Sequence, residues 1–519
     1  MESVLVHRSA RLLIPSLSDL FFLAILVWLF MTGGGAGWQG LLADADLGWH
    51  IRTGDYILST HTVPHHDLYS FSKPGAPWYA WEWLTDVLAS GLHTAAGLKG
   101  IVLAAGVLIS VFATSLIRRM ALKGSHIMVA LAIALLGVGS ASIHFLARPH
   151  ILTLVLLSFS VWMIESDREQ NSRRIWWLVP LTIVWTNLHG GFLALIAVLG
   201  LTTIGTALEV WLGGSGTLRS AFRYAKITAA CAAASLINPY GWNLHIHVGD
   251  YLQSDWIRSV VQEFQSPSFR TENMMQFEAL MLVGIMVAAT LFRRRRIVEG
   301  LWIVYWAHMA LGSVRHVPVF VAVATPILAA ELTVWWTAWT ASSKKSSLPG
   351  ILNQIAKDCL PGFCRGSMWP AMVVLALVFI GEPIKWPRDF PEVMFPTEMV
   401  HANLDLIGKS KLLTTDQWGD YLIYTDPKLK VFVDGRSDFY GPEVGGEYLK
   451  LISVAWDWQQ IMDKYQFDLA LLPAQFSLTQ ILKLAPGWHV LQDDGKRVLL
   501  ARTPTPVLPT GNSPSEPRF

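Results

Sequence analysis

The run DLFFLAILVWLFMTGGGAGW, residues 19–38, decides the fold class of this chain. A helix that crosses a membrane needs about 20 mostly apolar residues, and the one charged residue in this run is Asp19, at its start. The run is too long for the apolar core of a signal peptide, and no small-residue cleavage site follows it. The sequence therefore predicts a retained first membrane span. Two acids follow it closely, Asp44 and Asp46 in the run DADLGWH at 44–50.

The composition agrees with a membrane protein. Of the 519 residues, 52% are hydrophobic and only 15% are charged, against about 25% in an ordinary soluble domain. The formal net charge is +2, so bulk charge gives no reason to expect a nucleic-acid partner. Three cysteines do not make a disulfide framework. The apolar runs predict a mainly α, polytopic protein of about eleven spans, near 19–38, 98–117, 126–146, 150–164, 175–188, 191–212, 224–238, 276–292, 297–313, 317–337 and 368–382.

Basic residues assign the sides of the membrane. Loops that carry Lys and Arg clusters tend to stay in the cytoplasm, and here the clusters fall on alternate loops. These clusters are Arg8 and Arg11; Arg118, Arg119 and Lys123; Arg168, Arg173 and Arg174; Arg219, Arg223 and Lys226; 293–296; and Lys344 and Lys345. We therefore expect a bacterial inner-membrane protein with a cytoplasmic N-terminus. The first loop outside, 39–80, and a second at 239–275 belong to a membrane domain that spans residues 1–382.

A soluble part follows the last predicted span. Prolines 383, 387, 391 and 396 indicate a linker, and residues 383–505 then alternate between strand and helix patterns. Alternation of this kind is typical of a small α/β domain, which we expect outside the cytoplasm. Residues 506–519 have the composition of a disordered tail. The expected strands lie at 411–415, 430–433, 468–472, 489–492 and 497–501, and the expected helices at 416–425, 443–465 and 477–485.

The two aspartates after the first span are the leading catalytic candidates. Carboxylates are costly near hydrocarbon, and Asp44 and Asp46 could supply a general base or ligands for a divalent cation. His50 lies one helical turn beyond Asp46, and Arg52 follows. The structural alternative is that the two acids only cap a helix at the membrane edge. Further on in the same loop, Asp67 and Glu82 are candidate substrate contacts.

Two arginines suggest an anion site on the same side. Arg148 and Arg315 lie at the outer ends of predicted spans, although anchoring arginines favour the cytoplasmic side. A guanidinium fork suits a phosphate or pyrophosphate; the alternative is that these side chains reach from helix ends to the interface. Further candidate contacts on this side are His150, Asn187, His189, Glu263 and His316. The topology predicts that all of these residues line one external cavity.

A series of motifs covers nearly the whole chain, at 44–50, 52–55, 64, 67–72, 77–78, 82–84, 148–149, 187–192, 238–242, 263, 418–422 and 433–436. Together these motifs resemble a widespread bacterial membrane family described as glycosyltransferases of the GT-C type. More distantly, the chain resembles the protein mannosyltransferases, the aminoarabinose transferases and the catalytic subunit of oligosaccharyltransferase. The tail lacks the Trp-Trp-Asp motif of the oligosaccharyltransferases, which argues against asparagine glycosylation.

The resemblance implies a reaction. Such enzymes take a sugar from a polyprenyl phosphate or pyrophosphate, and an acid in the first external loop, here Asp44 or Asp46, takes part. The external acceptor would be a glycan, lipid or protein, held by a tail domain in which Asp434, Arg436 and Asp438 are candidates. A polar turn after a strand would equally explain those three. Two other classes remain open: a lipid or polysaccharide transporter or flippase, and a non-enzymatic membrane assembly protein.

Overall fold

The computed structural model describes residues 12–379 and 384–503, which form two compact units. The membrane unit comprises residues 1–66 and 77–391, and the tail unit comprises residues 67–76 and 392–519. The tail unit therefore takes in ten residues of the first predicted loop. The start of the predicted linker at Pro383 and the predicted disordered tail at 506–519 lie outside the described residues.

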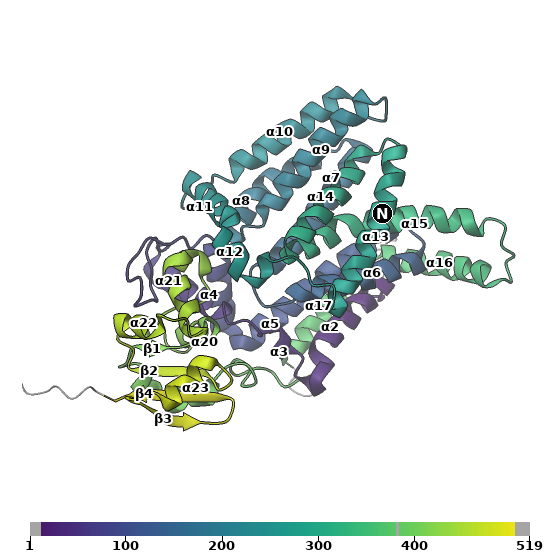
Figure 1. Cartoon of the computed structure of the whole chain (residues 1–519). Coiled ribbons are helices and arrows are strands. Elements are labelled where there is room, and N and C mark those ends of the chain that lie inside the picture. The colour runs from purple at the N-terminus through teal and green to yellow at the C-terminus, as the bar shows by residue number, and fades with distance from the viewer. Residues whose placement is uncertain (1–11, 380–383, 504–519) are drawn as a thin grey trace, which may run out of the picture. The chain divides into compact units, whose positions relative to one another are not determined.

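The membrane unit is built from helices (Figure 1). In chain order they are α2 (Leu17–Gly35), α3 (Trp38–Leu41), α4 (Leu47–Thr60), α5 (Trp83–Leu122), α6 (Ile127–Ala141), η1 (Ser142–His144), α7 (His150–Gln170), η2 (Arg173–Trp177), α8 (Leu178–Leu188), α9 (Phe192–Trp211), α10 (Leu218–Ala234), α11 (Trp242–Gln253), α12 (Asp255–Val260), η3 (Gln262–Phe264), α13 (Glu272–Arg293), α14 (Ile297–Gly312), η4 (Val314–His316), α15 (Val317–Thr340), α16 (Leu348–Cys364) and α17 (Trp369–Phe379).

Among the described residues, seven helices are long and apolar enough to cross a membrane. The number rises to eight if α16 and α17, which meet at a bend of 64°, form one broken span. This is a multi-pass membrane protein. The predicted count of about eleven spans is not confirmed, because three of the predicted segments form shorter helices. These are α8 with 11 residues, α10 with 17 and α14 with 16.

Helix α5 shows how a glycine divides a long apolar segment. It has 40 residues and departs from helical geometry at Gly97, where φ is +60°. A side chain would disfavour that conformation, so glycine allows the break. The predicted span 98–117 corresponds to the part after the break. The part before it, which begins at Trp83, was not expected to be helical and carries two acids of the candidate site, Glu82 at its start and Asp86 in its first turn.

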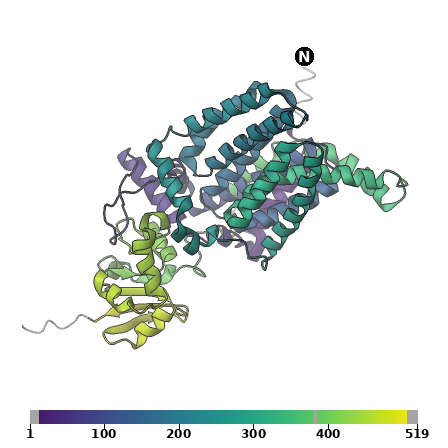
Figure 2. The same cartoon turned by 45° about the horizontal axis from the view of Figure 1, so that its top comes forward.

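Three helices of the membrane unit, α7, α9 and α15, carry different chemistry at their two ends. Figure 2 shows that many helices of this unit pack with their axes roughly aligned. At the carboxyl ends, the basic clusters predicted to be cytoplasmic form ion pairs. Arg168 of α7 contacts Glu209 of α9 at 3.2 Å, and Arg294 contacts Glu331 of α15 at 2.8 Å. The residues predicted to face outside precede the amino ends of the same helices: Arg148 before α7, His189 before α9 and Arg315 before α15.

The tail unit contains a four-stranded sheet in the order β1-β2-β4-β3. Strand β1 (Leu412–Leu413) is parallel to β2 (Leu469–Pro473), and β2 and β3 (Trp488–Asp493) are both antiparallel to β4 (Arg497–Arg502). The predicted helix at 416–425 is α20 (Asp416–Thr425), and that at 443–465 is two helices, α21 (Ser437–Ile452) and α22 (Trp458–Tyr465). The remaining helices are α18 (Thr397–Ala402), α19 (Leu404–Ile407) and α23 (Ser477–Leu484).

The strand predicted at 430–433 is wrong, and its actual pairing explains why. Val431 forms an isolated parallel bridge with Ser70, outside the four-stranded sheet. Its N–H donates to the Tyr69 carbonyl at 2.9 Å, and its own carbonyl accepts from Phe71 N–H at 2.9 Å. The Phe71 ring lies 6.1 Å from that of Phe432. The apolar run is buried as a strand would be, but its partner comes from the segment 67–76.

Candidate functional site

The local structure of the first loop decides between helix capping and another role for its two acids. Asp46 occupies the N-cap position of α4, yet its side chain makes no capping hydrogen bond. Asp44 accepts the Asp46 backbone N–H at 2.9 Å, which tightens the turn. The carboxylate of Asp46 instead contacts Arg148 Nη2 at 2.5 Å, and its residue is only 5% exposed. The pairing with a distant arginine argues against a simple cap.

Arg148 is the centre of an ion cluster drawn from four loops. Its Nη1 contacts Asp44 at 2.7 Å and Glu263 at 3.2 Å, and its Nη2 contacts Asp46. Glu263 also reaches Arg315 Nη2 at 3.7 Å. We call these five residues the acid–arginine cluster. The sequence predicted that they would meet, and the structure brings all five together.

The charges of this cluster shift the pKa values of Arg148 and Glu263 toward their ionised forms. Burial would lower the pKa of the Arg148 guanidinium, but Asp44, Asp46 and Glu263 outweigh that effect and hold the pKa well above its usual value. Burial would raise the pKa of Glu263, and Arg148 and Arg315 instead bring it far below its usual range. Counted by formal charge, the three acidic and two arginine side chains of the acid–arginine cluster sum to −1.

A second group of polar residues, the Glu82 group, lies within Coulombic range of Arg148. Glu82 faces two imidazoles, since its carboxylate oxygens lie 3.5 Å from His50 Nε2 and 3.5 Å from His189 Nε2. His50 Nδ1 in turn lies 2.6 Å from Asp86, whose side chain is fully buried in α5. Asp86 was not predicted. An acid one helical turn beyond Glu82 and inside an apolar helix was the signal that could have found it.

The hydrogen bonds of His189 fix its tautomer. The Gly191 N–H donates to His189 Nδ1 at 2.9 Å, so Nδ1 is an acceptor and Nε2 carries the proton that points to Glu82. Burial, followed by the nearby His150, Arg315 and Arg148, lowers the pKa of His189 well below its usual value. Burial and Arg148 do the same to the pKa of His50. Both rings are therefore neutral near pH 7.

Other predicted site residues are held by the fold. His150 Nε2 lies 2.6 Å from the His144 carbonyl, and His316 Nδ1 lies 3.2 Å from that of Met309. The Asn187 amide accepts from Trp83 Nε1 at 2.7 Å and donates to two backbone carbonyls, which ties helices together. Arg52 pairs with Asp55 at 2.9 Å. These contacts tie all four residues to the fold, and each of the two histidines has a second ring nitrogen.

The candidates in the tail unit form a network of their own. Arg436 contacts Asp67 at 2.8 Å and Asp434 at 2.6 Å, and the Tyr440 hydroxyl donates to Asp434 at 2.7 Å. All of these side chains are buried. Burial would lower the pKa of Arg436, but Asp434, Tyr440 and Asp67 hold it well above its usual value. Asp67 thus lies with the tail unit and secures the segment 67–76. The substrate role expected for it stays a prediction.

The carboxylates of the site do not form a metal centre by geometry. Within residues 12–379 and 384–503, no group of three or more His, Cys, Asp or Glu side chains is arranged to hold a metal ion. Arg148 lies among the three carboxylates and pairs with each of them. The divalent cation considered from the sequence stays a prediction.

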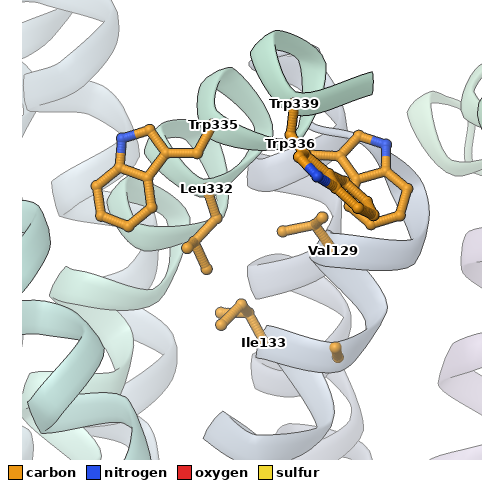
Figure 3. A pocket seen from close by; sticks show the side chains of 7 residues that line it. Val129, Ile133, Leu332, Trp335, Trp336 and Trp339 are labelled. Carbon is orange, nitrogen blue, oxygen red and sulfur yellow. The ribbon is translucent and has the colours of Figure 1, made fainter. Parts of the chain in front are cut away.

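A hollow of about 420 Å³ elsewhere in the membrane unit has no such chemistry. Figure 3 shows that it lies between α6 and α15 and is lined by aliphatic side chains and three tryptophans. Its lining residues are Val129, Ala132, Ile133, Leu332, Trp335, Trp336 and Trp339. Trp335 comes 20 residues after Arg315, which corresponds to roughly 30 Å along a helix. The hollow is thus remote from the acid–arginine cluster.

Comparison with solved structures identifies the fold. The archaeal oligosaccharyltransferase AglB from Archaeoglobus fulgidus, in complex with an inhibitory peptide and a dolichol-phosphate, matches with a TM-score of 0.59 and 10% identity, over 94% of this chain and 74% of that one. The apo form of the Archaeoglobus fulgidus oligosaccharyltransferase matches with a TM-score of 0.53 and 11% identity, over 88% and 69%. ArnT from Cupriavidus metallidurans, in the apo state, reaches a TM-score of 0.46 at 13% identity, over 89% and 93%.

Sequence comparisons add nothing to this. No family model matches the chain, and no match was found among curated protein sequences. At 10–11% identity, the structural likeness establishes the fold and leaves the substrate open. The mainly helical membrane unit, the small sheet of the tail unit and the matched length agree with it. The chain is a multi-pass membrane protein with the fold of the GT-C-type glycosyltransferases.

Proposed function

We propose that this protein is a membrane glycosyltransferase that moves a sugar from a polyprenyl phosphate or pyrophosphate to an acceptor outside the cytoplasm. The observation that carries the proposal is the acid–arginine cluster, in which two arginines and three carboxylates meet at the ends of helices of a GT-C-type fold. Arginine suits a lipid phosphate, and a carboxylate suits the proton of an attacking hydroxyl.

The donor's phosphate would bind at Arg315 and Arg148. A matched structure holds a dolichol-phosphate, which supports a donor of this class. The bond between the anomeric carbon and the phosphate oxygen breaks while the acceptor oxygen bonds to that carbon. Both guanidiniums would stabilise the charge that develops on the departing phosphate. The neutral rings of His150 and His316 each use their one N–H on a backbone carbonyl, and His189 directs its own toward Glu82. The charge of the phosphate would therefore be met by the two arginines.

Asp46, or else Asp44, would take the proton from the acceptor hydroxyl. Each is paired with Arg148 here, at 2.5 Å and 2.7 Å, and an ion-paired carboxylate is a weaker base. A phosphate that engages Arg148 would loosen these pairs and raise the basicity of the aspartates. Donor binding would in this way prepare the base, and the acceptor would react only when a donor is in place.

The ends of the helices support an orientation. The Lys and Arg clusters at one end would face the cytoplasm, as the positive-inside rule favours, and the acid–arginine cluster would face outward. In this arrangement the protein lies in a bacterial inner membrane, with its N-terminus inside and its tail unit outside. The tail unit would then help to hold the acceptor. Asp434 and Arg436 are buried, so exposed residues elsewhere in the tail unit would have to provide the contacts.

The test is turnover by the full-length chain in detergent or liposomes, with a panel of undecaprenyl-phosphate-linked sugars and chromatographic detection of released lipid phosphate. We expect Asp46→Asn, or Asp44→Asn if that residue is the base, to lower turnover by about 10²- to 10⁴-fold with the fold intact. Asp255→Asn, at an exposed carboxylate in α12, is the matched control. Full turnover in the double variant Asp44→Asn/Asp46→Asn would refute the assignment. Translocation of the donor without bond cleavage would favour a flippase instead.

A further inference from the structure

Glu263 occupies an unusual position among the carboxylates of the cluster. Its Oε1 lies 3.2 Å from Arg148 Nη1, and its Oε2 lies 3.7 Å from Arg315 Nη2. One carboxylate therefore bridges the two guanidiniums. A phosphate presents its oxygens to two arginines in the same bridging way. Glu263 thus lies where an anionic group of the donor would make its strongest contacts.

The backbone presents Glu263 to both arginines. It belongs to the short helix η3, which is bound to the η4 segment because Val314 N–H donates to the Gln265 carbonyl at 2.9 Å. The Ser313 hydroxyl donates to the backbone carbonyl of Glu263 itself at 2.8 Å. Arg315 also lies 4.5 Å above the ring of Phe264. These contacts fix the backbone of Glu263 next to both arginines, so Glu263 is not a mobile surface acid.

The same geometry allows the side chain to be displaced. Of the three carboxylates paired with Arg148, Glu263 makes the longest contact, 3.2 Å against 2.7 Å for Asp44 and 2.5 Å for Asp46. Its side chain is 26% exposed, the most of the three. A ligand can therefore reach this carboxylate more readily than the two aspartates. Rotation of one side chain would remove a carboxylate from both arginines, while Arg148 would keep its contacts with Asp44 and Asp46.

Displacement of Glu263 also changes the net charge that an incoming phosphate meets. With Glu263 in place the cluster carries a net charge of −1, which opposes the approach of a phosphate. When Glu263 leaves, two guanidiniums and two aspartates remain, and this local charge becomes zero. The phosphate would then replace a monovalent anion with one of equal or greater charge. When the lipid phosphate has been produced, the returning carboxylate would compete with it and favour its release.

We propose that Glu263 is an internal substitute for the donor's phosphate, which the donor must displace in order to bind. The inference rests on the proposed function, since it assumes that a lipid phosphate is the ligand of Arg148 and Arg315. It assigns Glu263 a role opposite to that of a substrate contact. As a positioning residue it holds the two arginines at a spacing that fits an anion, and it opposes binding of that anion.

The experiment measures the binding of undecaprenyl phosphate alone to the full-length protein in detergent at low ionic strength, by native mass spectrometry. Glu263→Gln should bind this lipid about tenfold more tightly than the unaltered protein, which is about 1.4 kcal/mol. Glu272→Gln removes the same charge from the exposed start of α13 and should change the dissociation constant less than twofold. Arg315→Gln should weaken binding by tenfold or more.

The outcomes separate the inference from the proposed function. If the unaltered protein binds the lipid and Glu263→Gln binds it equally or more weakly, Glu263 is no competitor and the inference fails alone. If neither binds undecaprenyl phosphate, the donor class is wrong and both proposals fail. Equal gains in Glu263→Gln and Glu272→Gln would indicate general electrostatics and would also overturn the inference. Should Glu263→Gln fold poorly, Glu263→Asp keeps the charge but is too short to bridge, and tighter binding is again expected.

Discussion

Replacing Arg148 with lysine tests whether the guanidinium fork organises the candidate site. Arg148 Nη1 contacts Asp44 at 2.7 Å while Nη2 contacts Asp46 at 2.5 Å, so two nitrogens hold two aspartates. Lysine keeps the charge but has a single ammonium, which can satisfy one of them well. A hydrogen bond to a charged group contributes about 1.5–3 kcal/mol. Because the Arg148 side chain is 21% exposed, we expect the low end, a loss of about 2 kcal/mol in unfolding free energy.

The measurement is an SDS titration in mixed micelles, followed by the fluorescence of the 24 tryptophans. In an Asp44→Asn background, Nη1 keeps only its longer contact, to Glu263 at 3.2 Å, so Arg148→Lys should cost less than about 1 kcal/mol. Arg258→Lys is the matched control, because Arg258 is exposed and lies 4.0 Å from Asp255, a geometry that contributes little. An equal cost of Arg148→Lys in both backgrounds, or no cost at all, would refute the role of the fork.

Three further predictions concern stability. Arg436→Gln should destabilise the tail unit by about 3–5 kcal/mol, because it leaves Asp434 buried without its cation. Differential scanning calorimetry that shows no loss of stability would contradict this. Gly54→Ala should destabilise the packing of α4 on α5, since a Cβ there would lie 2.0 Å from the Asp86 carbonyl oxygen; wild-type thermal stability would argue against that close approach. The free energy of unfolding should decrease as pH falls below about 6.5. Burial lowers the pKa of His50 in the folded state, so the unfolded chain binds the proton more readily. A free energy that stays constant between pH 7 and pH 5 in denaturant titrations would contradict this.

The sequence could predict that the site residues lie together, because short runs of apolar or basic residues determine the membrane topology. Apolar segments and basic clusters assign loops to sides without any knowledge of packing, and that assignment put Arg148, Glu263 and Arg315 at the same face. The pairing inside the cluster could not be predicted. Whether Arg148 meets a phosphate or Asp46 depends on how four loops are placed to within an ångström. Burial of Asp86 likewise becomes apparent only when α4 packs against α5.

The fold followed from the sequence where contacts are local. Helix α20 begins and ends where its pattern predicts, with Thr415 capping it through its hydroxyl. The strand predicted at 430–433 is wrong because its contacts are not local. Val431 pairs with Ser70, which lies 361 residues earlier in the chain. The predicted count of about eleven spans is not confirmed for a third reason. Apolar composition alone cannot show how long a helix will be, and α8, α10 and α14 all form but remain short.

The segment 67–76 has a practical consequence for anyone who wishes to separate the two units. The polypeptide passes from one unit to the other at 66/67, 76/77 and 391/392, so three chain connections join the tail unit to the membrane unit. Expression of residues 392–519 alone would omit Asp67 and Phe71, and with them a partner of Arg436 and part of an aromatic core. A soluble version should therefore be designed as a fusion that carries 67–76 as an added segment, by analogy with donor-strand complementation.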